Sequence, residues 1–511
     1  MKKQLKAGAI RWHGKWAWLA FAALIIWAAS GLLHPLLSWT GPKLAKFFPP
    51  SAKASAQQIN QIPVILAKQQ IEQALLVKLM PTQQGMTLQI TESADQPRRY
   101  FDLSSGEEMP NYDRQQAKWL ASYYTGRPEQ EVLSTELITA FNDDYPWVNR
   151  LLPVYQVKFV GDDGLRVFVY TETNAQAGIS NHYKARVQSW FRALHTWNWL
   201  QQLEYARVVI IALMMLALLA MTVTGISMLV MLKRSKKAPW QNTAHHWLAY
   251  IVCLPLLFFS FSGLYHLLQY ATGDNVRGMR MAKPLTWDNQ GLLASPVAEH
   301  ASQQLALNGV SLLRDDQGQL MYRLNLAKSR DNSAKKGGHH HHHGKHQEQA
   351  TAPSRQAIYD GIVVSDPAVY ISAENGKQMP FNDKALAIAL AQQHLGLSAD
   401  KLSEAKLITR FGMHYDFRNK RLPVWQLSYD TPEGDWVFVD PATGILVDRL
   451  NNQARFEGYS FSFLHKWNFL RPIMERTSRD IVMSVTLAVA MMFALFGVVI
   501  KLKRRKRRRR V

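Results

Sequence analysis

The chain has 511 residues, 47% of them hydrophobic, and a formal net charge of +22. Its length excludes a single hydrophobic core, and its mean hydropathy of −0.18 excludes a protein that lies almost entirely within a membrane. The charge does not indicate nucleic-acid binding, because nine of the ten residues at 501–510 are basic and follow an apolar run, as in a segment anchored on anionic lipid. Cys253 is the only cysteine, which excludes a disulfide framework and a cysteine-ligated metal site.

Four apolar runs have the length of a membrane-spanning helix. They cover about 16–37, 208–232, 247–270 and 481–500. Basic residues cluster before the first run, between the second and third, and after the fourth, so the positive-inside rule places these three sites in the cytoplasm. A cleaved signal peptide is the competing interpretation of the first run, but the cleavage-like triplet at 54–56 lies too far beyond it.

The predicted protein is a multi-pass protein of the bacterial inner membrane, with both termini cytoplasmic and two large periplasmic domains. The segments are a cytoplasmic N-terminus (1–15), a first spanning helix (16–37), a periplasmic domain (40–190), a return segment with the second helix (191–232), a cytoplasmic loop (233–243), a third helix (244–270), a second periplasmic domain (271–460), a return segment with the fourth helix (461–500) and a basic cytoplasmic tail (501–511). Within the first periplasmic domain, helical patterns at about 56–78, 113–124 and 129–141 precede a hairpin of strands at 153–157 and 166–170, which predicts an α+β module.

The second half of the chain repeats the first. Residues 422–427 match 152–157 at an offset of 270 (422 − 152), and residues 464–470 match 194–200 at the same offset. The first and third spanning helices match at an offset of 232 (245 − 13), so the second periplasmic domain carries 38 extra residues (270 − 232). This pattern predicts a duplicated helix–domain–helix chain.

The extra residues fall in a polar insert at about 328–355, which contains a run of histidines: His339, His340, His341, His342 and His343. Such a run is a weak metal-binding signal. The alternatives are a solvated low-complexity insert and an engineered tag.

Histidine occupies matched positions at both ends of the two repeated membrane helices. His13 and His34 flank the first helix, and His245, beside His246, and His266 flank the third. The spacing is 21 residues in both copies (34 − 13 and 266 − 245), roughly 31 Å of helix and close to the thickness of a bilayer core. An ionisable residue in a membrane segment is costly, so a functional role is the first hypothesis, and an interfacial residue bonded to a headgroup is the alternative.

Several repeated motifs resemble those of the PepSY-associated transmembrane family. They are His-His-Trp-Leu at 245–248, Ser-Gly-Leu-x-His at 30–34 and 262–266, Leu-His-x-Trp-Asn at 194–198 and 464–468, and Asp-Pro-Ala-Thr-Gly at 440–444. The first half departs from the last motif, since Tyr-Thr-Glu-Thr stands at 170–173. The resemblance implies a membrane α-helical protein with four transmembrane helices and two periplasmic α+β PepSY-like domains. Members of the family include inner-membrane haem proteins that reduce ferric siderophores in the periplasm, whereas other PepSY proteins are peptidase propeptides or regulators.

Haem b, held by two axial imidazoles from facing helices, is the economical explanation of the paired histidines. We expect one to three haems, with two preferred: one near the cytoplasmic face and one or two near the periplasmic face. The cytoplasmic candidates are His13, His245 and His246, and the periplasmic candidates are His34, His195, His266 and His465.

His195 and His465 lie 13 and 16 residues before the second and fourth apolar runs (208 − 195 and 481 − 465), so they reach a haem only if the return segments bend. His34 and His266 are therefore preferred. The tryptophans near the membrane boundaries are expected to form interfacial belts: Trp16, Trp18, Trp27, Trp197, Trp199 and Trp467.

The leading hypothesis is a ferric or ferrisiderophore reductase that passes electrons from the cytoplasmic side to a periplasmic ferric chelate and releases Fe(II). No dinucleotide fingerprint is present and the cytoplasmic parts are too short for a flavin domain, so the donor is another molecule: a cytoplasmic flavoprotein, free reduced flavin or a quinol. The alternative is a non-enzymatic PepSY membrane protein that binds or regulates a periplasmic protease or envelope partner. A metal permease is a third reading, but no intramembrane carboxylates line the helices. The sequence assigns neither a catalytic residue nor an oligomeric state.

Overall fold

The computed structural model describes residues 2–232, 238–273, 279–288, 294–295, 307–326, 359, 361–362 and 367–508. Its contacts divide the chain into two compact units. The helical unit comprises residues 1–41, 182–275 and 453–511, and the sheet unit comprises residues 42–181 and 276–452. The histidine run at 339–343 and its insert at about 328–355 lie outside the described residues.

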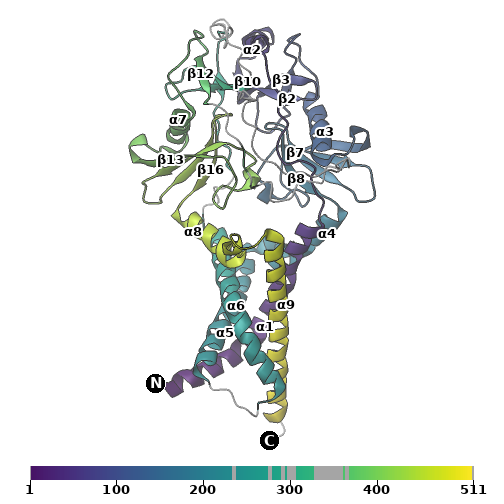
Figure 1. Ribbon diagram of the computed structural model, residues 1–511, viewed down its shortest axis with the longest axis vertical. Coiled ribbons are helices and arrows are strands. Elements are labelled where there is room, and N and C mark those ends of the chain that lie inside the picture. The colour runs from purple at the N-terminus through teal and green to yellow at the C-terminus, as the bar shows by residue number, and fades with distance from the viewer. Residues whose placement is uncertain are drawn as a thin grey trace, which may run out of the picture. The chain divides into compact units, whose positions relative to one another are not determined.

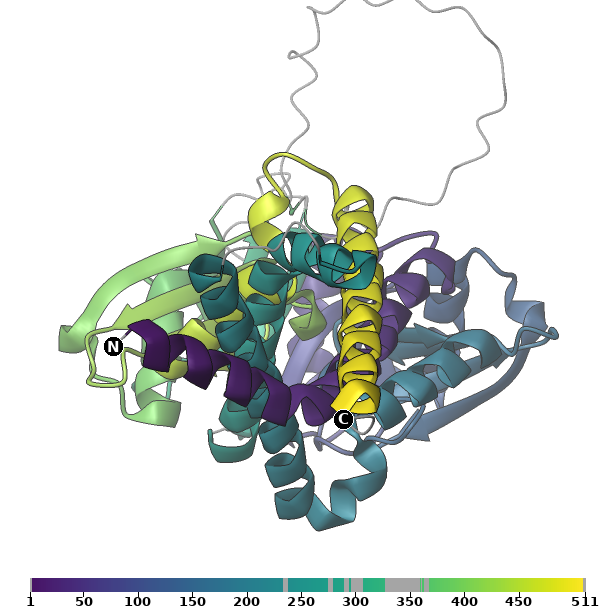
Figure 2. The same cartoon turned by 90° about the horizontal axis from the view of Figure 1, so that it is seen from below.

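Four long helices build the helical unit: α1 (Lys2–Thr40), α5 (Glu204–Met231), α6 (Trp240–Thr272) and α9 (Arg476–Arg508) (Figure 1). Each is long and apolar enough to cross a membrane, as the four apolar runs predict, so the protein is a multi-pass membrane protein. α1 packs against α5 and α9, and α6 packs against the same two helices. Seen from below, α1 and α9 join the teal helices α5 and α6 in one bundle (Figure 2).

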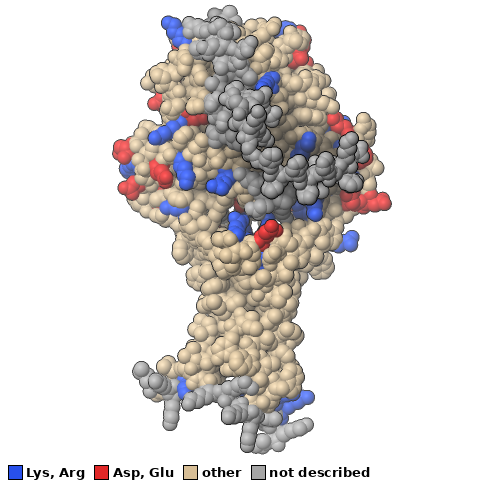
Figure 3. Space-filling model, viewed as in Figure 1, with Lys and Arg blue, Asp and Glu red and all other residues tan. Residues whose placement is uncertain are grey.

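Small residues fill the centre of this bundle. Ala20, Ala23 and Ala28 of α1 are buried, as are Ala249 of α6 and Ala490 of α9. Short side chains let helix backbones approach closely, which favours helix association in a membrane. On the face drawn in Figure 3, the visible middle of the helical unit shows no coloured charged side chains, consistent with a surface that lies against lipid.

A bent return segment leads into each of α5 and α9. In the first, α4 (His182–Phe191) continues as a π-helix, η3 (Arg192–Thr196), and η4 (Asn198–Leu203) follows. In the second, α8 (Asn452–Ser460) continues as a π-helix, η8 (Phe461–His465), and η9 (Asn468–Leu470) follows. Between these elements Trp197 and Trp467 adopt left-handed backbone angles, with φ of 51° and 50°. Because a π-turn and a left-handed residue both change the chain direction, the return segments are not straight extensions of the membrane helices.

Two antiparallel four-stranded sheets of the sheet unit have the same plan. The first, in the order β5-β6-β7-β8, has strands Val132–Ile138, Val154–Phe159, Arg166–Tyr170 and Ala175–Ser180. The second, in the order β13-β14-β15-β16, has strands Leu402–Ile408, Val424–Tyr429, Trp436–Asp440 and Ile445–Leu450. Helix α3 (Tyr112–Thr125) covers the first sheet and α7 (Asp383–Leu395) the second. Each strand of the second sheet begins 270 residues after its counterpart (402 − 132 for the first pair).

A six-stranded sheet joins residues of both halves in the order β12-β11-β10-β2-β3-β4. Its strands are β2 (Leu76–Thr82), β3 (Gly85–Thr91), β4 (Arg99–Phe101), β10 (Leu307–Arg314), β11 (Leu320–Leu326) and β12 (Val369–Ser372). β10 pairs with β2 through Ser311 opposite Lys78 and Leu312 opposite Val77. Helix α2 (Ala56–Lys68) buries Ile59 in the core against this sheet.

The described part of the sheet unit also contains short elements. They are the strand pair β1 (Gln73–Ala74) and β9 (Leu285–Thr286), and the 3-10 turns η1 (Glu129–Glu131), η2 (Trp147–Asn149), η6 (Ala399–Lys401) and η7 (Phe417–Asn419).

Two of the predicted helical patterns are wrong. The pattern at 56–78 is a helix only to Lys68, because Gln70 takes a left-handed angle and the chain continues into β1 and β2. The pattern at 129–141 is a 3-10 turn followed by β5, because β-branched residues of this segment pair with β6. The pattern at 113–124 is confirmed as α3.

Candidate functional site

His195 and His465 lie together in the helical unit. Their ring centroids are 6.4 Å apart and their planes cross at 83°. His465 is the last residue of its π-helix and His195 the last but one of its own, and the bend that follows each of them brings the two rings together. Arg207 of α5 donates to the carbonyl oxygen of Thr196 (2.7 Å) and so holds the first bend against its helix.

A serine fixes the protonation of each of these two imidazoles. The Ser30 hydroxyl donates to the carbonyl of Ile26 (2.7 Å), so its oxygen accepts from Nδ1 of His195 at 2.9 Å. Ser262 likewise donates to Phe258 (2.7 Å) and accepts from Nδ1 of His465 at 3.1 Å. This network assigns the hydrogen to Nδ1 in both rings and leaves Nε2 as the unprotonated, metal-binding nitrogen.

Aromatic side chains keep both rings in place. Phe191 stacks on His195 with centroids 4.7 Å apart, and Phe461 stacks on His465 at 4.6 Å. Burial lowers the pKa of His195 to about 4, and it lowers the pKa of His465 well below its ordinary value. Both imidazoles are therefore neutral near pH 7, which is the form that binds metals.

His34 and His266 lie beside this pair, and each contacts one of the two phenylalanines that stack on it. The His34 ring is 6.3 Å from Phe191, and the His266 ring stacks on Phe461 at 4.5 Å. Nδ1 of His266 contacts the carboxylate of Glu457 at 2.6 Å. The preference for these two histidines as ligands assumed straight return segments, and the observed bends remove that reason.

His13 and His245 form a second group at the other end of the bundle. Nδ1 of His13 contacts the Thr224 hydroxyl (3.2 Å), which itself donates to Ala220, and Nδ1 of His245 donates to the Phe493 carbonyl (3.1 Å). These partners again leave Nε2 as the unprotonated nitrogen. The two rings are close enough to interact electrostatically.

A glycine of a neighbouring helix faces each of these rings, and only the one beside His245 is tightly placed. A Cβ placed on Gly225 of α5 would lie 3.6 Å from Cε1 of His13, and one on Gly497 of α9 would lie 3.2 Å from Cε1 of His245. His246 points differently, since its ring contacts Trp247 and Tyr250, both of which are exposed. The structure thus groups His245 rather than His246 with His13.

These residues fit bis-imidazole ligation of haem. A metal–imidazole bond is about 2 Å long, so two imidazoles on opposite sides of one metal ion have centroids on the order of 6 Å apart. The His195–His465 separation of 6.4 Å agrees with that arrangement. Within the described part of the chain, no group of three or more His, Cys, Asp or Glu side chains could hold a bare metal ion.

Three of the expected belt tryptophans pack inside the helical unit instead. Trp27 stacks on Trp197 at 5.9 Å and donates its indole N–H to the carbonyl of His195 (3.0 Å). Trp467 is buried and stacks on Phe259 at 5.5 Å. Trp27 and Trp197 each have both an acceptor and a stacking partner inside the protein, and such indoles do not need the membrane interface. Trp18, by contrast, is exposed.

A buried charged network occupies the sheet unit at the segment that departs from the repeat. Glu172 is fully buried and accepts from Arg421 (2.9 Å), Tyr170 (2.8 Å) and Arg280. Although burial alone would raise its pKa, Arg280, Arg421 and Arg98 hold the pKa of Glu172 below its ordinary value.

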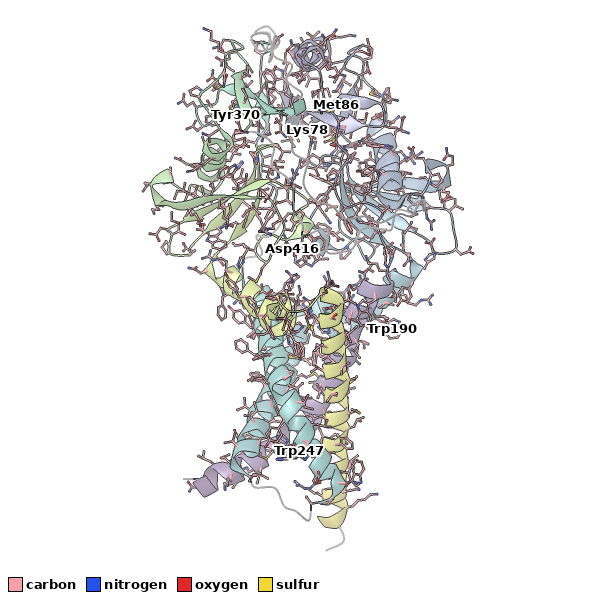
Figure 4. The ribbon with its side chains drawn as sticks, in the orientation of Figure 1. Lys78, Met86, Trp190, Trp247, Tyr370 and Asp416 are labelled. Atoms are coloured by element: carbon pink, nitrogen blue, oxygen red, sulfur yellow. The ribbon has the colours of Figure 1, made fainter. Side chains whose placement is uncertain are left out.

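Lys78, which lies in the interior of the same unit (Figure 4), donates to the carbonyl of Glu172. Burial lowers the pKa of this amine to about 7. Glu172 therefore joins Lys78 of the first half to Arg280 and Arg421 of the second.

Sequence reasoning missed the residues that orient the histidines. Ser30 and Ser262 are recognisable only as small residues, although each stands four positions before a histidine in both copies. The spacing Phe-x-x-x-His at 191–195 and 461–465 also repeats, and it places a stacking ring one helical turn from each imidazole.

One family model, described as "PepSY-associated TM region", matches residues 63–411. The match covers more than half of the 511 residues and includes α5, α6 and both four-stranded sheets in whole or in part. No curated protein matches the chain.

Proposed function

The chain belongs to the PepSY-associated TM region family, and from this premise we propose that it is a b-type haem protein of the bacterial inner membrane that reduces a periplasmic ferric chelate. The observation that carries the proposal is the His195–His465 pair, whose rings are 6.4 Å apart with both Nδ1 atoms bonded to serine hydroxyls. Axial ligation of haem iron requires two neutral imidazoles at about this separation, each with an unprotonated ring nitrogen.

His195 and His465 would hold one haem, and His13 and His245 a second. When bound, haem supplies reversible one-electron transfer. Ser30 and Ser262 orient the first pair of ligands and fix their tautomer, while Phe191 and Phe461 exclude water from their faces. Along α1, His13 and Ser30 are 17 residues apart (30 − 13), or about 25 Å of helix, so the two pairs serve opposite halves of the bilayer.

The proposed reaction is transfer of one electron to Fe(III) held by a siderophore or similar chelator. Such chelators offer hard oxygen ligands, which bind Fe(II) far more weakly than Fe(III), so reduction releases the metal for uptake. The basic loop and tail put the His13 end in the cytoplasm under the positive-inside rule, where a flavoprotein, free reduced flavin or a quinol is the donor.

We further infer that the chain arose by duplication of a helix–domain–helix unit. The constant offset of 270 residues between the two four-stranded sheets supports this inference, as do the matched π-helices and the matched left-handed Trp197 and Trp467. A parallel duplication relates the two histidines of each pair by a pseudo-two-fold axis along the membrane normal.

The test is anaerobic mixing of the purified, chemically reduced protein with a ferric siderophore, with Fe(II) trapped by a coloured ferrous chelator. Wild-type protein should release Fe(II), and His195→Ala and His465→Ala should lose most of that activity. His394→Ala, in the sheet unit, is the matched control and should behave as wild type. Equal Fe(II) release by all four proteins would contradict the proposal and would favour a non-enzymatic PepSY membrane protein that binds a periplasmic partner.

A further inference from the structure

A small cavity lies inside the sheet unit, among residues of both halves of the chain. Its volume is about 130 Å³. Three arginines, Arg150, Arg280 and Arg421, line it together with Tyr170, and apolar side chains such as Phe141 and Met279 supply the rest of the wall. The lining thus combines cationic side chains, which can contact an anionic group, with apolar side chains, which can contact a hydrocarbon group.

Two of the three arginines are already held by the protein. Arg421 donates to Asp440 (2.8 Å) and to Glu172 (2.9 Å). Arg150 donates to Asn419 (2.6 Å) and to Asp448 (3.1 Å). Both guanidinium groups are therefore ion-paired and fixed in place, so neither is free to turn toward a ligand.

Arg280 differs from them. Its Nη2 donates to Glu172, but its buried Nε–H has no acceptor within the part of the chain that the structure describes. A guanidinium carries five N–H donors in a fixed fork, and a buried donor without an acceptor is unfavourable. An oxygen atom supplied by a ligand in the cavity would satisfy it.

The repeat shows that the first half lacks one carboxylate beside this cavity. Asp440 is the carboxylate that ends β15, and the matching position at the end of β7 is Tyr170 (440 − 270). The first half therefore places a neutral phenol beside the cavity where the second half has an anion. A phenol is neutral at neutral pH, and Arg280, Arg421 and Arg98 share the one carboxylate of Glu172, so a negative charge added beside Arg280 is still attracted.

We propose that this cavity binds a short-chain organic carboxylate, with its carboxylate on Arg280 and its hydrocarbon against Phe141 and Met279. A volume of 130 Å³ corresponds to about four liquid-water volumes, which suits a group of about four to six non-hydrogen atoms. The apolar wall favours an organic carboxylate over inorganic phosphate, and planar carboxylates match the guanidinium fork. The proposal is independent of the haem-based function.

The experiment is calorimetric titration of the full-length protein in detergent at constant ionic strength. Butyrate is the probe, butyramide is its neutral isostere, and inorganic phosphate tests the alternative anion. Wild-type protein should bind butyrate at least ten-fold more tightly than the other two. Arg280→Lys keeps the charge beside Glu172 but removes the Nε–H, and it should weaken butyrate binding at least ten-fold.

Met279→Trp fills the cavity without changing a charge and should abolish butyrate binding, whereas Leu133→Trp, on an exposed strand position, should not. If Arg280→Lys does not fold, the butyrate affinity of Met279→Trp alone tests the proposal. Equal binding of butyrate and butyramide, preference for phosphate, no binding by wild-type protein, or wild-type affinity in Met279→Trp would each overturn the proposal.

Discussion

His195 and His465 come from opposite halves of the chain, yet their imidazole rings meet at 6.4 Å with an interplanar angle of 83°. Neither residue lies on one of the four long helices. A π-helix and a left-handed tryptophan bend each return segment so that the two histidines meet. Each imidazole also bonds to a serine that lies one turn before a histidine of a neighbouring helix. The proposed haem site depends on the contact between these two bent segments.

Replacing Ser30 by alanine should weaken haem retention. The substitution removes the acceptor of the His195 Nδ1–H, so the ring loses both its orientation and its preferred tautomer. Loss of a partner that orients a metal ligand costs about ten- to a hundred-fold in metal affinity. Haem content and the position of the reduced α-band measure the effect, and Ser30→Thr should restore both.

Ser260→Ala is the matched control for that substitution. Ser260 is buried in α6 and donates to the Leu256 carbonyl (2.6 Å), as Ser30 donates to its own helix, but it bonds to no histidine in the described part of the chain. Equal haem loss in Ser30→Ala and Ser260→Ala would mean that helix stability, not ligand orientation, is at stake.

Gly497→Ala should perturb the cofactor at the His13 end only. Its Cβ would lie 3.2 Å from Cε1 of His245, a contact that forces the ring to move. Gly14→Ala, at the same end of the bundle, meets no atom within 4 Å and should be silent. Low-temperature spectra that resolve two α-bands should show one band altered in Gly497→Ala; identical spectra for both variants would remove His245 as a ligand.

Glu172→Gln should destabilise the sheet unit by about 3–5 kcal/mol, because it leaves the buried Arg421 and the partly buried Arg280 beside a neutral amide. Glu136→Gln breaks an exposed pair with Lys158 and should change stability little. Denaturant unfolding followed by circular dichroism in the strand region compares the two variants. A Glu172→Gln protein as stable as Glu136→Gln would show that the arginines do not depend on this carboxylate.

The stability of the sheet unit should rise with pH between about 7 and 10.5. Burial lowers the pKa of Lys78 to about 7 from its ordinary value of 10.5, so the unfolded chain binds more protons than the folded chain across that window. Glu172, Arg98, Arg421 and Asp440 surround this amine.

Lys78→Met cannot titrate and should lack this contribution, so its melting temperature should rise less with pH than that of wild-type protein. Parallel melting curves for the two proteins across the same pH range would contradict the assignment.

The membrane helices and the repeated strands are readable from the sequence because each follows a local rule. Hydropathy and length define the four spans, and alternating residues at 153–157 and 166–170 define a hairpin. The helical pattern at 129–141 fails because pairing with β6 overrides local propensity. Likewise, no local sequence pattern predicts the pairing of β10 with β2, because these strands are far apart in the chain.

The sequence predicts which histidines belong to the candidate site but not how they are arranged. Matched positions identify the histidines, but the ranking that preferred His34 and His266 assumed straight helices. The π-helices at 192–196 and 461–465 have no recognised sequence signal, and their conformation is set by packing of the return segments on α1 and α6. The sequence does not predict the ion pairs of Glu172 either, because its partner Arg421 lies 249 residues away along the chain.

The most direct test of the account is the reduced-minus-oxidised absorption spectrum of the full-length protein, purified after expression with ample haem. We expect a Soret band and b-type α- and β-bands from the wild-type protein, all with lower intensity in His195→Ala and His465→Ala. A colourless wild-type protein, or bands unchanged in both variants, would contradict it.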